Sequence, residues 1–152
     1  MGEGPHDKAF VNHIKGLFDT RETEQTIKVQ SADGGSPKDI IKSAIRSRHA
    51  AYDRRYVFMD TDVPITPSDK KYAREHKIGL ILSEPLCLEC MLLEVLGKRS
   101  AHNCQDCKER LHPMLFGSPT RKESYAELFP SEVLMASDKK QIQNLIRIIS
   151  ND

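Results

Sequence analysis

The chain has 152 residues, of which 38% are hydrophobic and 30% are charged, the composition of a soluble globular protein. That length is enough for one domain with a core of its own. The 23 lysines and arginines nearly balance the 22 acidic residues, which excludes a protein-wide positive field, so any nucleic-acid surface must be a local patch.

Helical and extended patterns alternate along the chain. Apolar residues at helical spacing predict a helix over 7–18, and alternation predicts a strand over 26–30. A turn-rich loop over 31–37 leads into a helix with Ser36 as its N-cap and Pro37 at its first position. The later predicted elements are, in chain order, a strand over 56–60, a helix over about 67–76, a strand over 78–83, and helices over 87–97, about 104–115 and 131–149.

This order of elements predicts an α/β fold. Strands that are apolar throughout and separated by helices are typical of a parallel sheet covered on both faces. We expect a single domain over 1–152, with a core of about 1–97 and a helical C-terminal part over about 98–152, and we find no internal repeat.

The sequence shows no sign of a membrane segment or a secretory leader. Its longest apolar run, around "CMLLEVLG", is too short to span a bilayer. The N-terminal "MGEGPHDKAF" lacks the basic start and apolar stretch of a signal peptide, and it fits a myristoylation pattern poorly. We therefore expect a cytoplasmic protein without membrane contact, whose four cysteines stay reduced unless they bind metal.

Two aspartates follow the apolar stretch "YVFM". Asp60 and Asp62 lie at the carboxyl end of this strand, the edge at which ligands gather in parallel α/β sheets. Residues two apart on an extended backbone point the same way, so both carboxylates can face one point and would repel without a cation between them. Oxygen ligands suit Mg²⁺ or Mn²⁺, although aspartate is also an ordinary turn residue.

A second acidic group precedes the first helix. In "EGPHD", Glu3 and Asp7 flank a Gly-Pro and could join the same cluster if their segment lay beside the Asp60 strand. The alternative is that acidic residues near a helix start simply favour the helix dipole, and Asp7 could be an ordinary first-turn residue.

Together these motifs resemble the Toprim-type metal nucleases, most closely the RloB-like and OLD-type branch. The order is that family's: "EGPHD" before a helix, "YVFMDTD" at a strand end, and a strand leading to Ser-x-Pro and an apolar helix in "ILSEPLCLECMLLEVLG". The downstream "NCQDCKERLHPML" and "SYAELF" also look like that family, so the resemblance runs from Glu3 to about Phe129.

The resemblance implies a Toprim-like, Rossmann-like fold with a small parallel sheet of about four strands flanked by helices. It implies hydrolysis of the phosphodiester bonds of DNA or RNA by metal-activated water, in anti-phage defence. An ATPase partner is implied in the same way, and the chain could form a homodimer. The residues implied are Glu3 and Glu89 as catalytic glutamates, Asp60 and Asp62 as catalytic ligands of Mg²⁺ or Mn²⁺, Asp7 and Glu3 as further metal contacts, and Ser83 as an accessory residue.

Four cysteines form two pairs with the spacing C-x₂-C-x₁₃-C-x₂-C. The set of Cys87, Cys90, Cys104 and Cys107 is close to the pattern of a structural zinc site, which would join two helices. The first pair, however, sits in the apolar stretch "PLCLECMLLEV", where cysteines at i and i+3 of a helix also serve as small buried hydrophobes. Zinc and buried thiols both stay open, and this setting favours thiols.

Basic residues gather in two places near the acidic pair. Arg54 and Arg55 adjoin the strand, and Lys70 and Lys71 follow the Asp-x-Asp loop, where they could contact the phosphates of a nucleic acid. A solvated helix face explains the two lysines equally well. Among the histidines, His6 lies inside the acidic motif and could touch substrate, whereas the others show no ligand spacing.

Alternatives to a nuclease stay open. A degenerate Toprim-like module would bind nucleic acid or an ATPase without cutting, and a zinc-stabilised binding protein would be organised around the four cysteines. Another phosphoryl-transfer enzyme would share the acidic cluster, because a fold alone does not determine the reaction.

Overall fold

The structure is a computed structural model that describes residues 4–19, 27–31, 35–46 and 54–150. Its elements are, in chain order, α1 (Pro5–Phe18), α2 (Pro37–Arg46), β1 (Arg55–Asp60), α3 (Pro67–Glu75), β2 (Ile78–Ser83), α4 (Leu88–Val95), α5 (Cys104–Leu111), the 3₁₀ turns η1 (His112–Met114) and η2 (Lys122–Tyr125), α6 (Ser131–Ala136) and α7 (Lys140–Ser150). None of the helices in these ranges has the length and apolar character needed to cross a bilayer.

The two strands form a parallel pair whose carboxyl ends lie together. β1 and β2 pair in register, from Arg55 opposite Ile78 to Asp60 opposite Ser83. The predicted α/β class and the parallel pairing are confirmed, with two strands in the described part of the chain where about four are expected. This register places the last residue of β1 directly beside the last residue of β2.

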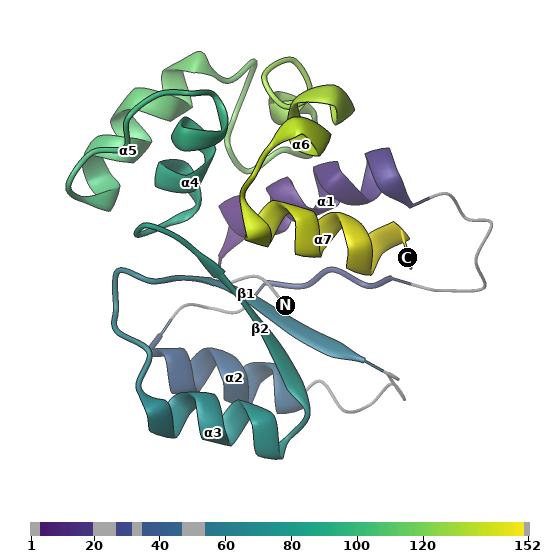
Figure 1. Cartoon of the computed structure of the whole chain (residues 1–152), viewed down its shortest axis with the longest axis vertical. Coiled ribbons are helices and arrows are strands. Elements are labelled where there is room, and N and C mark those ends of the chain that lie inside the picture. The colour runs from purple at the N-terminus through teal and green to yellow at the C-terminus, as the bar shows by residue number, and fades with distance from the viewer. Residues whose placement is uncertain (1–3, 20–26, 32–34, 47–53, 151–152) are drawn as a thin grey trace.

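Helices cover both faces of the strand pair, which separates two apolar cores (Figure 1). α2 and α3 pack on one face, around Val57, Met59 and Ile78. On the other face, Phe58 and Ile81 join a larger core that includes side chains of α1, α4, α5 and α7. Successive strand residues thus point to opposite faces and both faces are apolar, which explains why the strands are continuous apolar runs in the sequence.

The predicted start of α2 is confirmed by its capping contacts. The Oγ of Ser36 accepts a hydrogen bond from the Asp39 N–H at 3.2 Å, and the Asp39 carboxylate accepts one from the Ser36 N–H at 3.1 Å. α3 begins with the same reciprocal arrangement between Thr66 and Asp69. In both helices proline occupies the first position, where its missing N–H costs nothing.

The strand predicted over 26–30 is wrong for residues 27–30, which have no regular secondary structure. The segment offers two apolar side chains, Ile27 and Val29, and each is only partly buried. The Nζ of Lys15 donates to the Ile27 carbonyl oxygen at 2.7 Å, so a side chain of α1 contacts this segment. Alternation alone is a weak strand signal, because a strand also needs a neighbour that buries one of its faces.

The single helix predicted over 131–149 is two helices, α6 and α7. α6 ends because Ser137 has an extended backbone, with φ −69° and ψ 138°. The Gln143 side chain then donates to the carbonyl oxygens of Met135 and Ser137, at 3.3 and 2.7 Å, and so satisfies acceptors at the end of α6. The side chains of Leu134, Ile142, Leu145 and Ile149 are buried and form the inner face of these two helices.

α1 is attached to the C-terminal part by a buried histidine and by ring contacts. The Nε2 of His13 lies 2.7 Å from the carbonyl oxygen of Phe129, to which it can only donate. Phe10 packs edge-on against Tyr125 and Phe129, with ring centroids 5.8 and 6.1 Å apart. Burial lowers the pKa of His13, and the hydrogen bond to Phe129 offsets this only in part, so the ring is held neutral.

We expect His13 to make the protein less stable in acid. Its pKa is lower in the folded protein than in the unfolded chain, so its contribution is present above a pH of about 6.5 and is lost as the pH falls below that value. Urea unfolding at about pH 7.5 and about pH 5.5 should show a larger loss of unfolding free energy in the wild type than in His13→Gln. Glutamine keeps an N–H for Phe129 without titrating, and equal losses in both proteins would contradict this role.

Candidate functional site at the start of α4

The first turn of α4 is where several of the sequence motifs meet. Cys87 precedes the helix, and its side chain makes no capping hydrogen bond. Instead the Oδ1 of Asp60, at the end of β1, accepts a hydrogen bond from the Leu88 N–H at 3.1 Å. A carboxylate there satisfies one of the unpaired N–H groups of the helix end and interacts favourably with its dipole. Asp60 therefore ties the end of β1 to the start of α4.

Thr61 holds the loop between β2 and α4 at the same place. Its N–H donates to the Leu86 carbonyl oxygen at 2.8 Å, and its Oγ1 lies 2.9 and 3.0 Å from the carbonyl oxygens of Ser83 and Pro85. The Oγ of Ser83 is itself buried and has no hydrogen-bond partner among the residues that the structure describes. The Ser-x-Pro motif is thus brought against the end of the Asp60 strand.

Asp62 lies beyond the end of β1 and accepts a different hydrogen bond from that of Asp60. Residues 61–63 form a bend, so the extended geometry that would align the two carboxylates stops at Asp60. Asp62 is exposed, and its Oδ1 accepts a hydrogen bond from the Val63 N–H at 3.0 Å. Burial raises the pKa of the Cys104 thiol, and the nearby charges of Asp62 and Asp60 raise it further, so the acidic pair lies close to a cysteine.

Of the other two predicted acidic ligands, the structure describes only Asp7. Glu3 lies outside the described residues. Asp7 is 6% exposed, and its Oδ2 accepts a hydrogen bond from the Gly4 N–H at 3.1 Å, the role of a residue that helps to begin α1. Within the described ranges, neither Asp7 nor the acidic pair belongs to a group of three side chains spaced to hold a metal ion.

Glu89 is buried in the first turn of α4 and contacts two histidines from distant parts of the chain. Its side chain is 3% exposed, and its Oε1 lies 3.2 Å from the Nδ1 of His6 and 3.0 Å from the Nε2 of His112. The two imidazole rings stand edge to face, with centroids 5.0 Å apart. Three elements, α1, α4 and the turn after α5, therefore meet at one carboxylate. One donor atom from each residue lies within 4.8 Å of the others, a spacing that could hold a metal ion.

The hydrogen bonds around Glu89 keep it ionised. Burial raises the pKa of its carboxyl, but hydrogen bonds from His6, from its own backbone N–H and from His112 outweigh burial and hold the pKa at about 2. The side chains of His6 and His112 are 30% and 23% exposed. The imidazoles therefore lie between a buried charge and the solvent.

The sequence motifs identify Glu89 but not its partners. His6 is marked only by its place inside the acidic motif, and His112 has no predicted role because no ligand spacing includes it. The signal for His112 is its position directly after the helix that carries the second cysteine pair. An interaction that holds the two cysteine pairs together therefore also places His112 beside α4.

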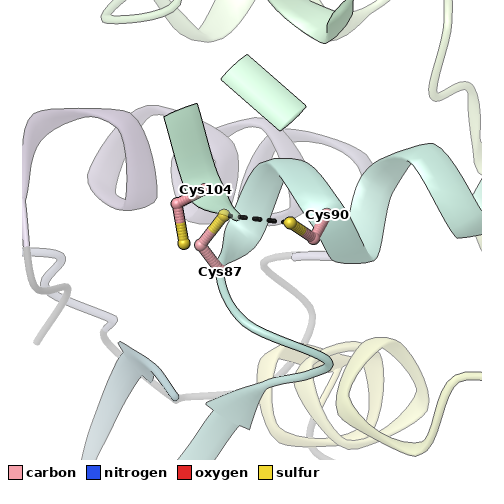
Figure 2. Close-up of side chains that lie close together, drawn as sticks. All are labelled: Cys87, Cys90 and Cys104. Atoms are coloured by element: carbon pink, nitrogen blue, oxygen red, sulfur yellow. Dashed lines mark hydrogen bonds between the residues drawn. The ribbon is translucent and has the colours of Figure 1, made fainter. Parts of the chain in front are cut away.

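The four cysteines converge beside the same helix start. Cys90 is disulfide-bonded to Cys107, and the Cys87 Sγ lies 3.5 Å from the Cys90 Sγ. The sulfur atoms of Cys87, Cys90 and Cys104 lie within 4.8 Å of one another, and Figure 2 shows these three side chains gathered at the start of α4. The expectation that the first pair lies inside an apolar helix is wrong for Cys87, because α4 begins only at the next residue.

The predicted nucleic-acid contacts lie in two separate places. Arg54 and Arg55 stand at the amino end of β1, roughly 17–20 Å from Asp60 along a strand that rises about 3.3 Å per residue. Lys70 and Lys71 lie on α3, which the chain enters from the loop that follows β1. The lysines thus lie on a helix that covers one face of the strand pair, whereas Asp60 contacts α4 on the other face, and the arginines are at the amino end of β1.

No protein-family model, curated protein or solved structure matches this chain. The geometry of the described residues is therefore the basis for assigning a function.

Replacing Asp60 by alanine should destabilise the protein more than replacing it by asparagine. Alanine removes the acceptor for the Leu88 N–H and should lower the free energy of unfolding by about 1–2 kcal/mol, as the loss of a helix cap does. Asparagine keeps a side-chain oxygen for this N–H and should lower the free energy of unfolding by clearly less. Urea unfolding of both variants at neutral pH measures the difference, and equal losses would show that this contact does not stabilise α4.

Proposed function

We propose that this chain is a divalent-metal-dependent phosphodiesterase that cleaves nucleic acid at the start of α4. The observation that carries the proposal is the meeting of three motifs that are far apart in the sequence. His6 of "EGPHD" contacts Glu89 at 3.2 Å, and Asp60 of "YVFMDTD" accepts the Leu88 N–H at 3.1 Å. These are the motifs whose order resembles that of the Toprim-type, RloB-like nucleases.

Asp60 and Asp62 would hold Mg²⁺ or Mn²⁺ beyond the carboxyl end of β1. Both residues supply carboxylate oxygens, the ligands that these ions prefer, and the carboxyl ends of parallel strands are where ligands bind in α/β sheets. The resemblance adds Glu3 to this set. When bound, the ion would supply an activated water and stabilise negative charge on the phosphate.

Glu89 and its two histidines would carry the proton transfers. The carboxylate accepts a hydrogen bond from the Nδ1 of His6, which leaves Nε2 as the basic nitrogen of that ring; for His112 the positions are reversed. A buried carboxylate that fixes the tautomer and orientation of an imidazole is a recurring arrangement in general acid–base catalysis. Hydrolysis of a phosphodiester needs one proton taken from water and one given to the leaving oxygen. A neutral imidazole would take the first proton, and the other imidazole, protonated on both nitrogens, would give the second.

The substrate would be DNA or RNA, with Lys70 and Lys71 of α3 contacting phosphates beside the one that is cut. The resemblance to RloB-like proteins also suggests an ATPase partner and a role in anti-phage defence. Cleavage by the isolated chain is the part of this proposal that can be tested directly.

The test is cleavage of plasmid DNA and of total tRNA by the purified chain in Mg²⁺, Mn²⁺ or EDTA. The wild type should cut one substrate class with metal and neither class with EDTA. The double variant Asp60→Asn, Asp62→Asn should lower the rate at least about 100-fold, because it removes the metal-binding charges and keeps an oxygen for the Leu88 N–H. Glu132→Gln, which changes an exposed carboxylate on α6, is the matched control and should cut like the wild type.

Glu89→Gln tests the proton-transfer group separately from the metal. Losing the charge that orients both histidines should lower the rate about 100-fold and alter the pH–rate profile, while the metal concentration for half-maximal activity stays the same. Circular dichroism of each variant checks that it is folded. Cutting that survives the double aspartate substitution, or no cutting of either substrate with either metal, would contradict the proposed function.

A further inference from the structure

We propose that the reduced chain binds one zinc ion through Cys87, Cys90, Cys104 and Cys107, as a structural site that joins α4 to α5. The proposal goes beyond the phosphodiesterase activity, because it concerns other side chains and predicts properties that can be measured without a substrate.

Three of the four sulfur atoms lie close to the spacing of a tetrahedral thiolate site. With Zn–S bonds of about 2.3 Å, the sulfurs of such a site stand about 3.8 Å apart. The sulfurs of Cys87 and Cys90 are 3.5 Å apart, and both lie within 4.8 Å of the Cys104 sulfur. Cys107 is bonded to Cys90 and so belongs to the same cluster. A disulfide needs only two cysteines, whereas a metal ion accounts for the gathering of all four.

Each cysteine pair spans the first turn of a helix. Cys87 is the residue before α4 and Cys90 lies in its first turn, while Cys104 opens α5 and Cys107 follows one turn later. Both helices thus start at the cluster, where their dipoles stabilise negative charge. The Ala101 N–H also donates to the Cys107 Sγ at 3.3 Å, the kind of hydrogen bond that orients a metal-bound thiolate.

Zinc binding at this site would exchange protons and would not transfer electrons. Four thiols release four protons as four Zn–S bonds form, which leaves a cluster with two net negative charges. The disulfide between Cys90 and Cys107 must first be opened by a thiol or phosphine reductant, which supplies two electrons and is itself oxidised. Four thiolates suit zinc or iron, and we choose zinc because it has no redox chemistry and fits a site that only holds two helices together.

α5 needs such a link because it buries few of its side chains. Among its residues only Cys107 and Leu111 are buried, which is little apolar contact for a short helix. α5 leads directly into His112, whose Nε2 lies 3.0 Å from Glu89. A zinc ion that anchors α5 would therefore also position this histidine.

Metal content and thermal stability test the site. The full chain, purified in a phosphine reductant without chelator, should contain one zinc per chain by plasma mass spectrometry. Cys87→Ser removes one of the four ligands, so it should lose the zinc and lower Tm by more than about 10 °C. Met91→Leu, which changes a buried sulfur-containing residue that is not a ligand, is the matched control and should keep the zinc.

Cobalt binding to the wild type is a second test of the site. Its result does not depend on whether the variant folds. Co²⁺ added to metal-free, reduced protein should produce the strong visible absorption of a tetrahedral thiolate complex. The proposal would be overturned by reduced wild type that takes up no zinc from zinc salt, by stoichiometric iron in its place, or by a Cys87→Ser variant as stable as the wild type.

Discussion

The hydrogen bond from the Leu88 N–H to Asp60 is the contact on which the arrangement of the candidate site depends. It joins β1 to α4 at 3.1 Å, and α4 is buried from Leu88 to Leu93. Water has little access to the N–H groups of such a helix end, so a side chain has to supply an acceptor. The same carboxylate that the strand-end motif marks as a metal ligand is therefore also a helix cap. Asp60 therefore has a structural role as a helix cap as well as its proposed role as a metal ligand.

Glu89 places a charge inside the apolar core, and this has a cost that the surrounding segments must offset. A buried carboxylate without partners costs several kcal/mol, yet hydrogen bonds from two histidines and the backbone keep the pKa of Glu89 at about 2. The histidines come from α1 and from the turn after α5, so both segments must be in place before the charge is compensated. An apolar side chain would fill this position at lower cost, and for that reason a charge here favours a functional site over a purely structural one.

The apolar pattern of the sequence predicts best those elements that are buried on both sides. The strands over 56–60 and 78–83 are continuous apolar runs that end at polar residues, and both are present with nearly these bounds. The strand prediction is wrong over 27–30 because alternation does not reveal whether a neighbouring strand exists. The prediction of one helix over 131–149 is wrong because the apolar spacing continues across residues 137–139. There serine and aspartate favour local turns over helix.

The candidate site is predictable from motif order only in part, because its central contacts join residues far apart in sequence. His6 and His112 are 83 and 23 positions from Glu89, and nothing in their local sequence marks the contact. The spacing of the cysteines indicates the contact between His112 and Glu89 indirectly. Two pairs that meet at one cluster require α5 to fold back on α4, and His112 then follows from the end of α5. Asp60 and the cysteines thus both hold the start of α4, whose first turn carries the buried charge of Glu89.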